Sequence, residues 1–247
     1  MAFYRKWVFP LLAGLLWAVF LTLDLTGLAD STWVKYAALC LCCGTALTGM
    51  RTADGKLVAA ALCLTVAADW FLLVRNDHYE LGIGIFIMVQ LIYAYRLYHL
   101  RGQGLQLWRL IPRLLLCMAS LLFLPLGFCI SSFCLRYVPP FAERSLFLSY
   151  FFGNALHRAY LMFTLPIFYF LNLCLNTAEA FSLGPKARRF AWGLLLFVLC
   201  DLCVGACSLG LLTSFTWWGS WLFYLPSQVL IVLSQEPEKG DPDEKRF

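Results

Sequence analysis

The sequence predicts an all-α protein, a polytopic membrane helical bundle, and three observations lead to this prediction. Of the 247 residues, 62% are hydrophobic and only 13% are charged. The apolar residues fall in long runs, and short polar connections separate these runs. Because about 20 apolar residues span the hydrocarbon core of a bilayer as a helix, such runs are typical of membrane proteins. We therefore expect an integral multi-pass protein of the cell (plasma) membrane, with the bilayer as its surroundings.

We expect eight transmembrane helices, each close to the length that spans a bilayer. They cover residues 7–28, 33–50, 57–74, 81–98, 110–134, 160–178, 191–209 and 218–234. Polar links with turn residues, such as RTADGK and RNDHYE, reverse the chain between neighbouring helices. Residues 135–159 are expected to lie at the interface or to lengthen the sixth helix, with a ninth span as the alternative. The helices form one domain, residues 1–234, with two four-helix halves as an option, and residues 235–247 form a flexible polar tail.

The distribution of basic residues predicts the orientation. Only five of the 19 Lys and Arg residues fall on one side of the eight-helix arrangement; they are Lys35, Arg75, Arg136, Arg144 and Arg158. The other side carries the rest, so the positive-inside rule places both termini in the cytoplasm. The balance fits with the first helix retained rather than cleaved as a signal peptide, and a ninth span would break it.

Charge and cysteine usage argue against several other classes. The net charge of +5 comes from scattered loop residues without a basic stripe, so no nucleic-acid partner is expected. The eleven cysteines lie in or beside apolar segments, where they act as small apolar side chains. Two C-x-x-C pairs, Cys40/Cys43 and Cys200/Cys203, lack the loop and nearby histidines of zinc sites. No metal and no cofactor is therefore predicted, and the oligomeric state is left open.

Two aspartates stand inside membrane segments. Asp69 interrupts AALCLTVAADWFLLV, and Asp201 interrupts AWGLLLFVLCDLCVGACSLG. An aspartate at the centre of a membrane helix costs about 2.5 to 3.5 kcal/mol, so an intramembrane acid is by default a functional-site hypothesis. At a rise of 1.5 Å per residue each acid lies within roughly 5 Å of the midpoint of its segment. The two can therefore meet at one depth, and the alternative is that each acid only pairs with a polar residue of another helix.

The four blocks AADWFLLV, LGIGIFIMVQLIYAYRLY, FAWGLLLFVLCDLCVGA and WLFYLPSQVLIVLS resemble the YhhN family of lysoplasmalogenases, which are eight-helix membrane enzymes. The resemblance implies that Asp69 and Asp201 match the paired acids of the family. Tyr93 matches the tyrosine of the fourth helix, and Gln228 matches the glutamine of the eighth. These positions imply two catalytic acids with a substrate pocket beside them.

Three residues depart from the family pattern. Ala68 replaces a glycine, Gln90 replaces a histidine and Cys200 replaces a serine. Gln90 cannot titrate, so a proton-handling role of that histidine would be lost or changed. Gln90 and Gln228 are expected to line the pocket or to hold helices together through amide hydrogen bonds. Asn172 lies on one helix face with Asn176, where lining the pocket and packing are equally open.

The implied reaction suits two acids in one apolar pocket. Hydrolysis of a 1-alkenyl ether begins with protonation of the vinyl carbon and passes through an oxocarbenium-like cation. Two neighbouring carboxyl groups of low solvation do not both ionise cheaply, so one keeps a proton to donate and the other stabilises the cation. We therefore expect a lysoplasmalogenase acting on a lyso-ether phospholipid, with release of a fatty aldehyde and a glycerophospho-amine. The alternatives are a lipid-binding family member without activity and a small proton-coupled transporter.

Overall fold

The computed structural model describes residues 3–102, 111–113, 115, 119, 156–208 and 213–235. The chain forms two compact units. One contains residues 1–104 and 173–247, and the other contains residues 105–172. Residues 110–134, predicted as the fifth helix, lie almost wholly outside the described residues, as do most of residues 135–159 and all of residues 236–247. The division of the chain into one domain and a tail stays a prediction.

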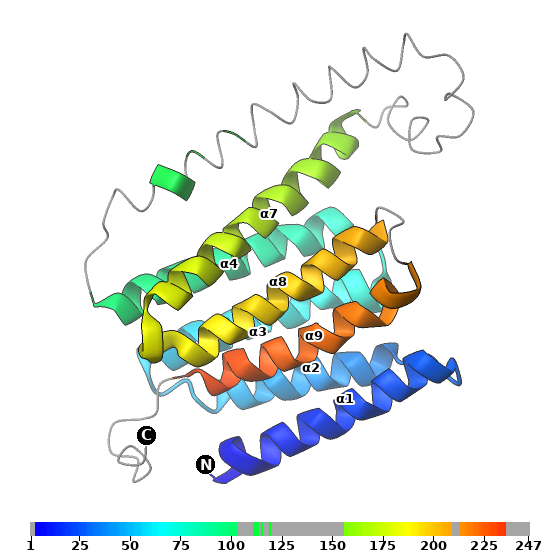
Figure 1. Cartoon of the computed structure of the whole chain (residues 1–247), viewed down its shortest axis with the longest axis horizontal. Helices are drawn as coiled ribbons and strands as arrows, with labels where there is room; N and C mark the ends of the chain where they lie inside the picture. Colours follow the sequence, from blue (N-terminus) through cyan, green and yellow to red (C-terminus); the bar gives the residue numbers. More distant parts are fainter. Residues whose placement is uncertain are drawn as a thin grey trace. The chain divides into compact units, whose positions relative to one another are not determined.

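The described residues are helical, with turns between the helices and no strand among them. In chain order the elements are η1 (Tyr4–Val8), α1 (Phe9–Thr26), α2 (Thr32–Leu47), α3 (Ala53–Asp69), η2 (Trp70–Arg75), α4 (Tyr79–Arg101), α7 (Leu156–Ser182), η4 (Gly184–Ala187), α8 (Arg188–Ser208) and α9 (Thr213–Leu233). Each predicted segment other than 110–134 coincides with a helix. Figure 1 shows α1, α2, α3, α4, α8 and α9 running side by side.

In the part of the chain that the structure describes, four helical stretches are long and apolar enough to cross a membrane. They are Tyr4–Thr26, Ala53–Arg75, Tyr79–Arg101 and Gly184–Ser208. Among the described residues, Thr32–Leu47 and Trp218–Leu233 are apolar helices of shorter length. The prediction of an all-α membrane bundle is therefore confirmed. The number of eight spans and the orientation stay predictions.

Small residues let the helices approach each other closely. Gly193 on α8 lies against α9, where a Cβ at its position would come within 3.2 Å of the Ser227 carbonyl oxygen and 2.9 Å of Ile231 Cγ1. Helices in lipid associate through such close packing, because water does not drive them together. The contact of α8 with α9 is the most extensive in the described part of the chain, and it brings the second predicted acid helix onto α9.

A buried ion pair joins four helices at one end of the bundle. Arg96 of α4 is fully buried and donates to both carboxylate oxygens of Asp54 of α3, from Nε at 2.6 Å and from Nη2 at 2.9 Å. It also donates to the hydroxyl and the carbonyl oxygen of Ser234, each at 2.8 Å, just after α9. Its guanidinium carbon lies 4.4 Å from the ring centroid of Phe190 on α8. The short RTADGK link places Asp54 for this contact, because the Thr52 side chain caps α3 by accepting from the amide of Gly55 at 2.9 Å.

Gln235 extends the same end of the bundle. Sequence reasoning placed it at the start of the polar tail, whereas its side chain is buried and donates to the carbonyl oxygens of Ala46 at 3.0 Å and Gly55 at 3.2 Å. Arg5 of η1 donates to the Gln235 side-chain oxygen and, at 2.9 Å, to the carbonyl oxygen of Val232. The carbonyl groups that accept these bonds belong to the last turns of α2 and α9 and to the first turn of α3. These bonds also hold the first and last described helices together.

Candidate active site

Asp69 lies where α3 gives way to the π-helix η2. Its side chain is buried, with 6% of the residue exposed, and Oδ2 accepts a hydrogen bond from the hydroxyl of Tyr224 on α9. The chain stays helical from Ala53 through Asp69 to Arg75, and the type of helix changes at Asp69. A π-helical turn widens the helix and is frequent at functional sites. Thr65, one turn earlier, donates to the carbonyl oxygen of Ala61 at 3.0 Å.

Asp201 lies on α8, which continues as an α-helix through this position to Ser208. Asp201 is partly exposed, whereas Asp69 is buried. Asp69 and Asp201 are near enough for a charge on one to be felt by the other, and the buried Cys200 thiol lies within electrostatic reach of both acids. Asp69 and Asp201 therefore share one electrostatic neighbourhood although 132 positions separate them in the sequence (201 minus 69).

Aromatic rings surround the acid site. The ring of Tyr224 lies 5.4 Å from that of Phe197 and 5.1 Å from that of Trp221, between centroids. Phe197 in turn meets Phe86 of α4 edge to face at 5.8 Å. Phe86, Phe197 and Tyr224 are buried, so hydrogen bonds and charges beside these rings act through a low local dielectric.

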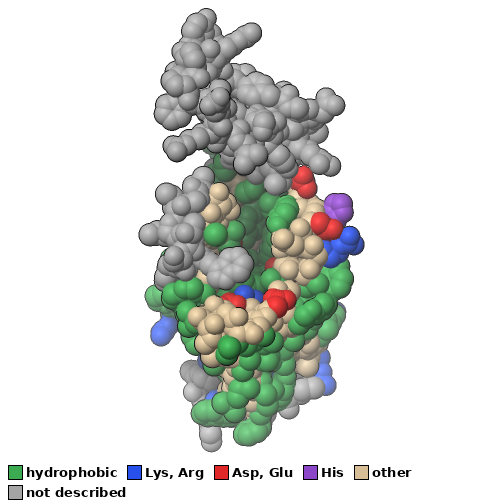
Figure 2. All heavy atoms as spheres, turned by 90° about the vertical axis from the view of Figure 1, so that its right-hand side faces the viewer, with side chains coloured by type: hydrophobic (Ala, Val, Ile, Leu, Met, Phe, Trp, Pro, Cys, Tyr) green, Lys and Arg blue, Asp and Glu red, His purple; other side chains and the backbone are tan. Residues whose placement is uncertain are grey.

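A second ion pair, between Lys35 and Asp24, lies toward the end of the bundle opposite the pair of Arg96 and Asp54. Lys35 Nζ lies 2.7 Å from Asp24 Oδ2, and both side chains are almost fully buried. Ser31 donates to the other oxygen of Asp24. The ammonium group lies 5.1 Å from the centroid of a Trp221 ring, in cation–π contact. Figure 2 looks onto this end of the bundle, where a few charged side chains interrupt a mostly hydrophobic surface.

Three of the four predicted pocket residues are buried in the same compact unit as Asp69. Gln90 and Tyr93 on α4 and Gln228 on α9 are 1%, 0% and 0% exposed. The amide of Asn176 donates to the side-chain oxygen and to the carbonyl oxygen of Gln90, each at 2.9 Å. The ring of Tyr93 meets that of Phe190 edge to face at 5.2 Å.

Asn172, the fourth predicted pocket residue, belongs to the other compact unit. Its side-chain oxygen accepts from Arg113 Nη1 at 3.3 Å, and its amide donates to the carbonyl oxygen of Phe168 at 2.8 Å. Asn176, one helical turn later, is the asparagine that meets Gln90. The two asparagines thus have separate hydrogen-bond partners.

Sequence reasoning missed Tyr224 and the pair of Lys35 with Asp24. A signal for Tyr224 exists, because it stands four residues before Gln228 and so shares its helix face. Pro226 stands between them, and α9 runs from Thr213 to Leu233 with this proline inside. Lys35 was counted only as a loop charge, and its burial on α2 has no signature in composition.

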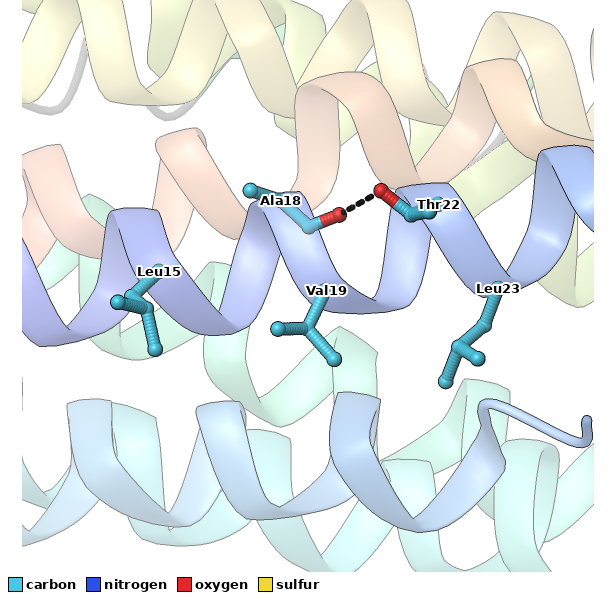
Figure 3. A pocket seen from close by; sticks show the side chains of 5 residues that line it. All are labelled: Leu15, Ala18, Val19, Thr22 and Leu23. Carbon is cyan, nitrogen blue, oxygen red and sulfur yellow. Dashed lines mark hydrogen bonds between the residues drawn. The ribbon is translucent and has the colours of Figure 1, made fainter.

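A shallow groove lies on α1, away from these acids in sequence. It has a volume of about 320 Å³ and is lined by Leu15, Ala18, Val19, Thr22 and Leu23. Figure 3 shows these side chains, with the Thr22 hydroxyl bound to the carbonyl oxygen of Ala18 at 2.8 Å. None of the five titrates, so the groove offers no group for acid–base chemistry.

The cysteines form one close pair among the described residues. The sulfur atoms of Cys43 on α2 and Cys63 on α3 lie 3.5 Å apart, and both thiols are free. In the described part of the chain, no three side chains of His, Cys, Asp or Glu gather closely enough to hold a metal ion.

A bundle of apolar helices with two interacting intramembrane acids defines a polytopic membrane protein with a buried acid site. The model of the YhhN family matches residues 30–235. The chain therefore belongs to the YhhN family. Comparison with curated proteins and comparison with solved structures each gave no significant match.

Proposed function

We propose that the protein is a membrane-embedded hydrolase that cleaves the vinyl-ether bond of lysoplasmalogens. One observation carries the proposal: Asp69 is buried inside an apolar bundle with Asp201 in its electrostatic neighbourhood, in a chain of the YhhN family. An alkenyl ether needs a proton donor, a group that stabilises a cation and a dry site that holds an alkyl chain. An acid pair in a membrane bundle supplies the proton donor and the group that stabilises the cation. The alkyl chain of the lipid can reach such a site from the bilayer.

The burial of the two acids suggests which one carries the proton. Removing an ionised carboxylate from water costs several kcal/mol in proteins, whereas one hydrogen bond to a charged group returns about 1.5 to 3 kcal/mol. Asp69 is buried and receives a hydrogen bond from Tyr224, so burial outweighs the bond and favours the neutral acid. Asp201 is less deeply buried in the bundle, and we assign it the negative charge, because neighbouring carboxyl groups of low solvation do not both ionise cheaply.

The reaction then follows from these assignments. Asp69 gives its proton to the vinyl carbon beyond the one that bears oxygen, and the double-bond electron pair forms the new C–H bond. The resulting cation is shared by the other vinyl carbon and the ether oxygen, and the charge of Asp201 stabilises it. Water adds to that carbon and loses a proton to a carboxylate. The hemiacetal breaks its bond to the glycerol oxygen, which leaves a fatty aldehyde and a glycerophospho-amine.

The decisive experiment measures aldehyde release from a lysoplasmalogen by purified protein in lipid nanodiscs. Asp69→Asn and Asp201→Asn are each expected to lower the rate about 100-fold or more, the scale of a general-acid contribution. Asp30→Asn is the matched control, because Asp30 is exposed at the start of α2 and asparagine keeps the acceptor used by Thr32. In D₂O the aldehyde should carry one deuterium on the carbon next to the carbonyl. Full activity of both acid variants would refute the mechanism.

Two alternatives have observations in their favour. The π-helix at Asp69 is the kind of helix irregularity that transporters use at their ion sites, and proton-coupled flux in proteoliposomes without aldehyde release would favour transport. Gln90 stands where the family carries histidine, which favours an inactive lipid-binding member. Binding of lyso-ether lipid without turnover across a broad pH range would identify that case.

A further inference from the structure

Three buried side chains in the middle of the bundle each carry a polar atom that has no hydrogen-bond partner among the described residues. The atoms are the amide nitrogen of Gln90, the hydroxyl of Tyr93 and the amide oxygen of Gln228. All three residues are at most 1% exposed. An unsatisfied buried polar group costs about 1 to 3 kcal/mol, and native proteins satisfy nearly all of them. Three such groups in one part of the bundle indicate that a bound molecule makes the missing hydrogen bonds.

Contacts with α8 place the three residues at one depth. On α4, Phe86 meets Phe197 and Tyr93 meets Phe190, so Gln90, which lies between them, faces the middle of that stretch of α8. Gly193, within the same stretch, packs on Ser227 and Ile231 of α9. Gln228 directly follows Ser227 in the sequence. The three residues therefore lie at one level of the bundle, within about one helical turn of each other along its axis.

The hydrogen-bonding properties of the three atoms define which chemical group they could bind together. The amide nitrogen of Gln90 only donates, the amide oxygen of Gln228 only accepts, and the tyrosine hydroxyl does both. A hydroxyl group complements this set, because it accepts from one partner and donates to another. We propose that Gln90, Tyr93 and Gln228 form a buried binding site for a single hydroxyl group, one layer below the acid pair.

The hydroxyl can come from two sources with the same chemistry. A buried water is bound by two to four polar partners, and hydrolysis consumes one water in each turnover. The free hydroxyl on the glycerol of a lysolipid is the other source. This second source rests on the proposed function, since it requires a lyso-ether lipid with its vinyl group at Asp69. Gln228 follows Tyr224 by one helical turn on the same face of α9, which places the site next to the acids.

The first arm of the test measures the thermal stability of Tyr93→Phe, which removes one hydroxyl and little else. Tyr95→Phe is the matched control, because Tyr95 is 56% exposed on the same helix. With a bound hydroxyl, Tyr93→Phe loses one hydrogen bond and lowers Tm by roughly 2–4 °C, whereas the control leaves Tm unchanged. If the layer is dry, Tyr93→Phe removes an unpaired polar group and leaves Tm unchanged or raises it.

The second arm measures binding of two lipids that cannot be hydrolysed, a 1-alkyl lysophospholipid with a free 2-hydroxyl and its 2-deoxy analogue. Preference for the free hydroxyl by about 10-fold in Kd, lost in Tyr93→Phe, assigns the site to the lipid. Equal binding together with the fall in Tm assigns it to water. Equal binding with no fall in Tm overturns the proposal. Neither arm needs turnover, so absence of aldehyde release would refute the proposed function without deciding this one.

Discussion

Breaking the pair of Asp54 and Arg96 should cost more stability than any change at an exposed ion pair of this protein. Arg96 is fully buried, and two of its four hydrogen bonds go to Asp54. In Asp54→Leu the guanidinium keeps its bonds to Ser234 but loses its counter-charge. A buried charge left without its partner costs about 3 to 5 kcal/mol. For a chain of this length that corresponds to a fall in Tm of roughly 6–20 °C.

A double-mutant cycle separates this cost from the value of the pair itself. The cycle compares the free energies of unfolding of the unmodified protein, Asp54→Leu, Arg96→Met and the double variant. Each protein is unfolded in mixed micelles by increasing the proportion of a denaturing detergent. The double variant should be more stable than the sum of the single changes predicts, with a coupling energy of about 1 to 3 kcal/mol. Arg75→Met is the control, since its pair with Asp77 is 51% and 37% exposed and is worth at most about 1 kcal/mol. A cost below 1 kcal/mol for Asp54→Leu, or simple additivity, would refute the reasoning.

Three further predictions test the site and the packing. Tyr224→Phe should lower the rate of aldehyde release about 10-fold by removing one hydrogen bond from the acid, and an unchanged rate would exclude the contact from the mechanism. Mild oxidation should join Cys43 and Cys63 in one disulfide without dimer formation, as read from intact mass and peptide mapping, because their sulfur atoms lie 3.5 Å apart. Gly55→Ala should cost about 1 to 3 kcal/mol, because its methyl group would strike a backbone carbonyl, whereas Gly44→Ala has open space and should cost nothing measurable by thermal unfolding.

The sequence alone determined the class of the protein and the places of those helices that the structure describes. Hydropathy is sufficient for this because a bilayer accepts only segments that satisfy their own backbone, and helices of about 20 apolar residues do so. The same argument singled out Asp69 and Asp201, since a carboxyl group in an apolar run stands out at any orientation. Arg96 shows the limit of that argument. It lies in a helix that the sequence predicted, yet it was read only as a charge near a loop.

Only the tertiary structure decided which side chains meet. Tyr224 donates to Asp69 across 155 positions, and Arg96 reaches Asp54 across 42. In a soluble helix the apolar stripe tells which face packs inward. A membrane helix such as α3 is apolar on all sides, because lipid is as apolar as the bundle interior. Its sequence therefore records that it spans the membrane, and the packing of small residues against neighbouring helices decides which face each polar group takes.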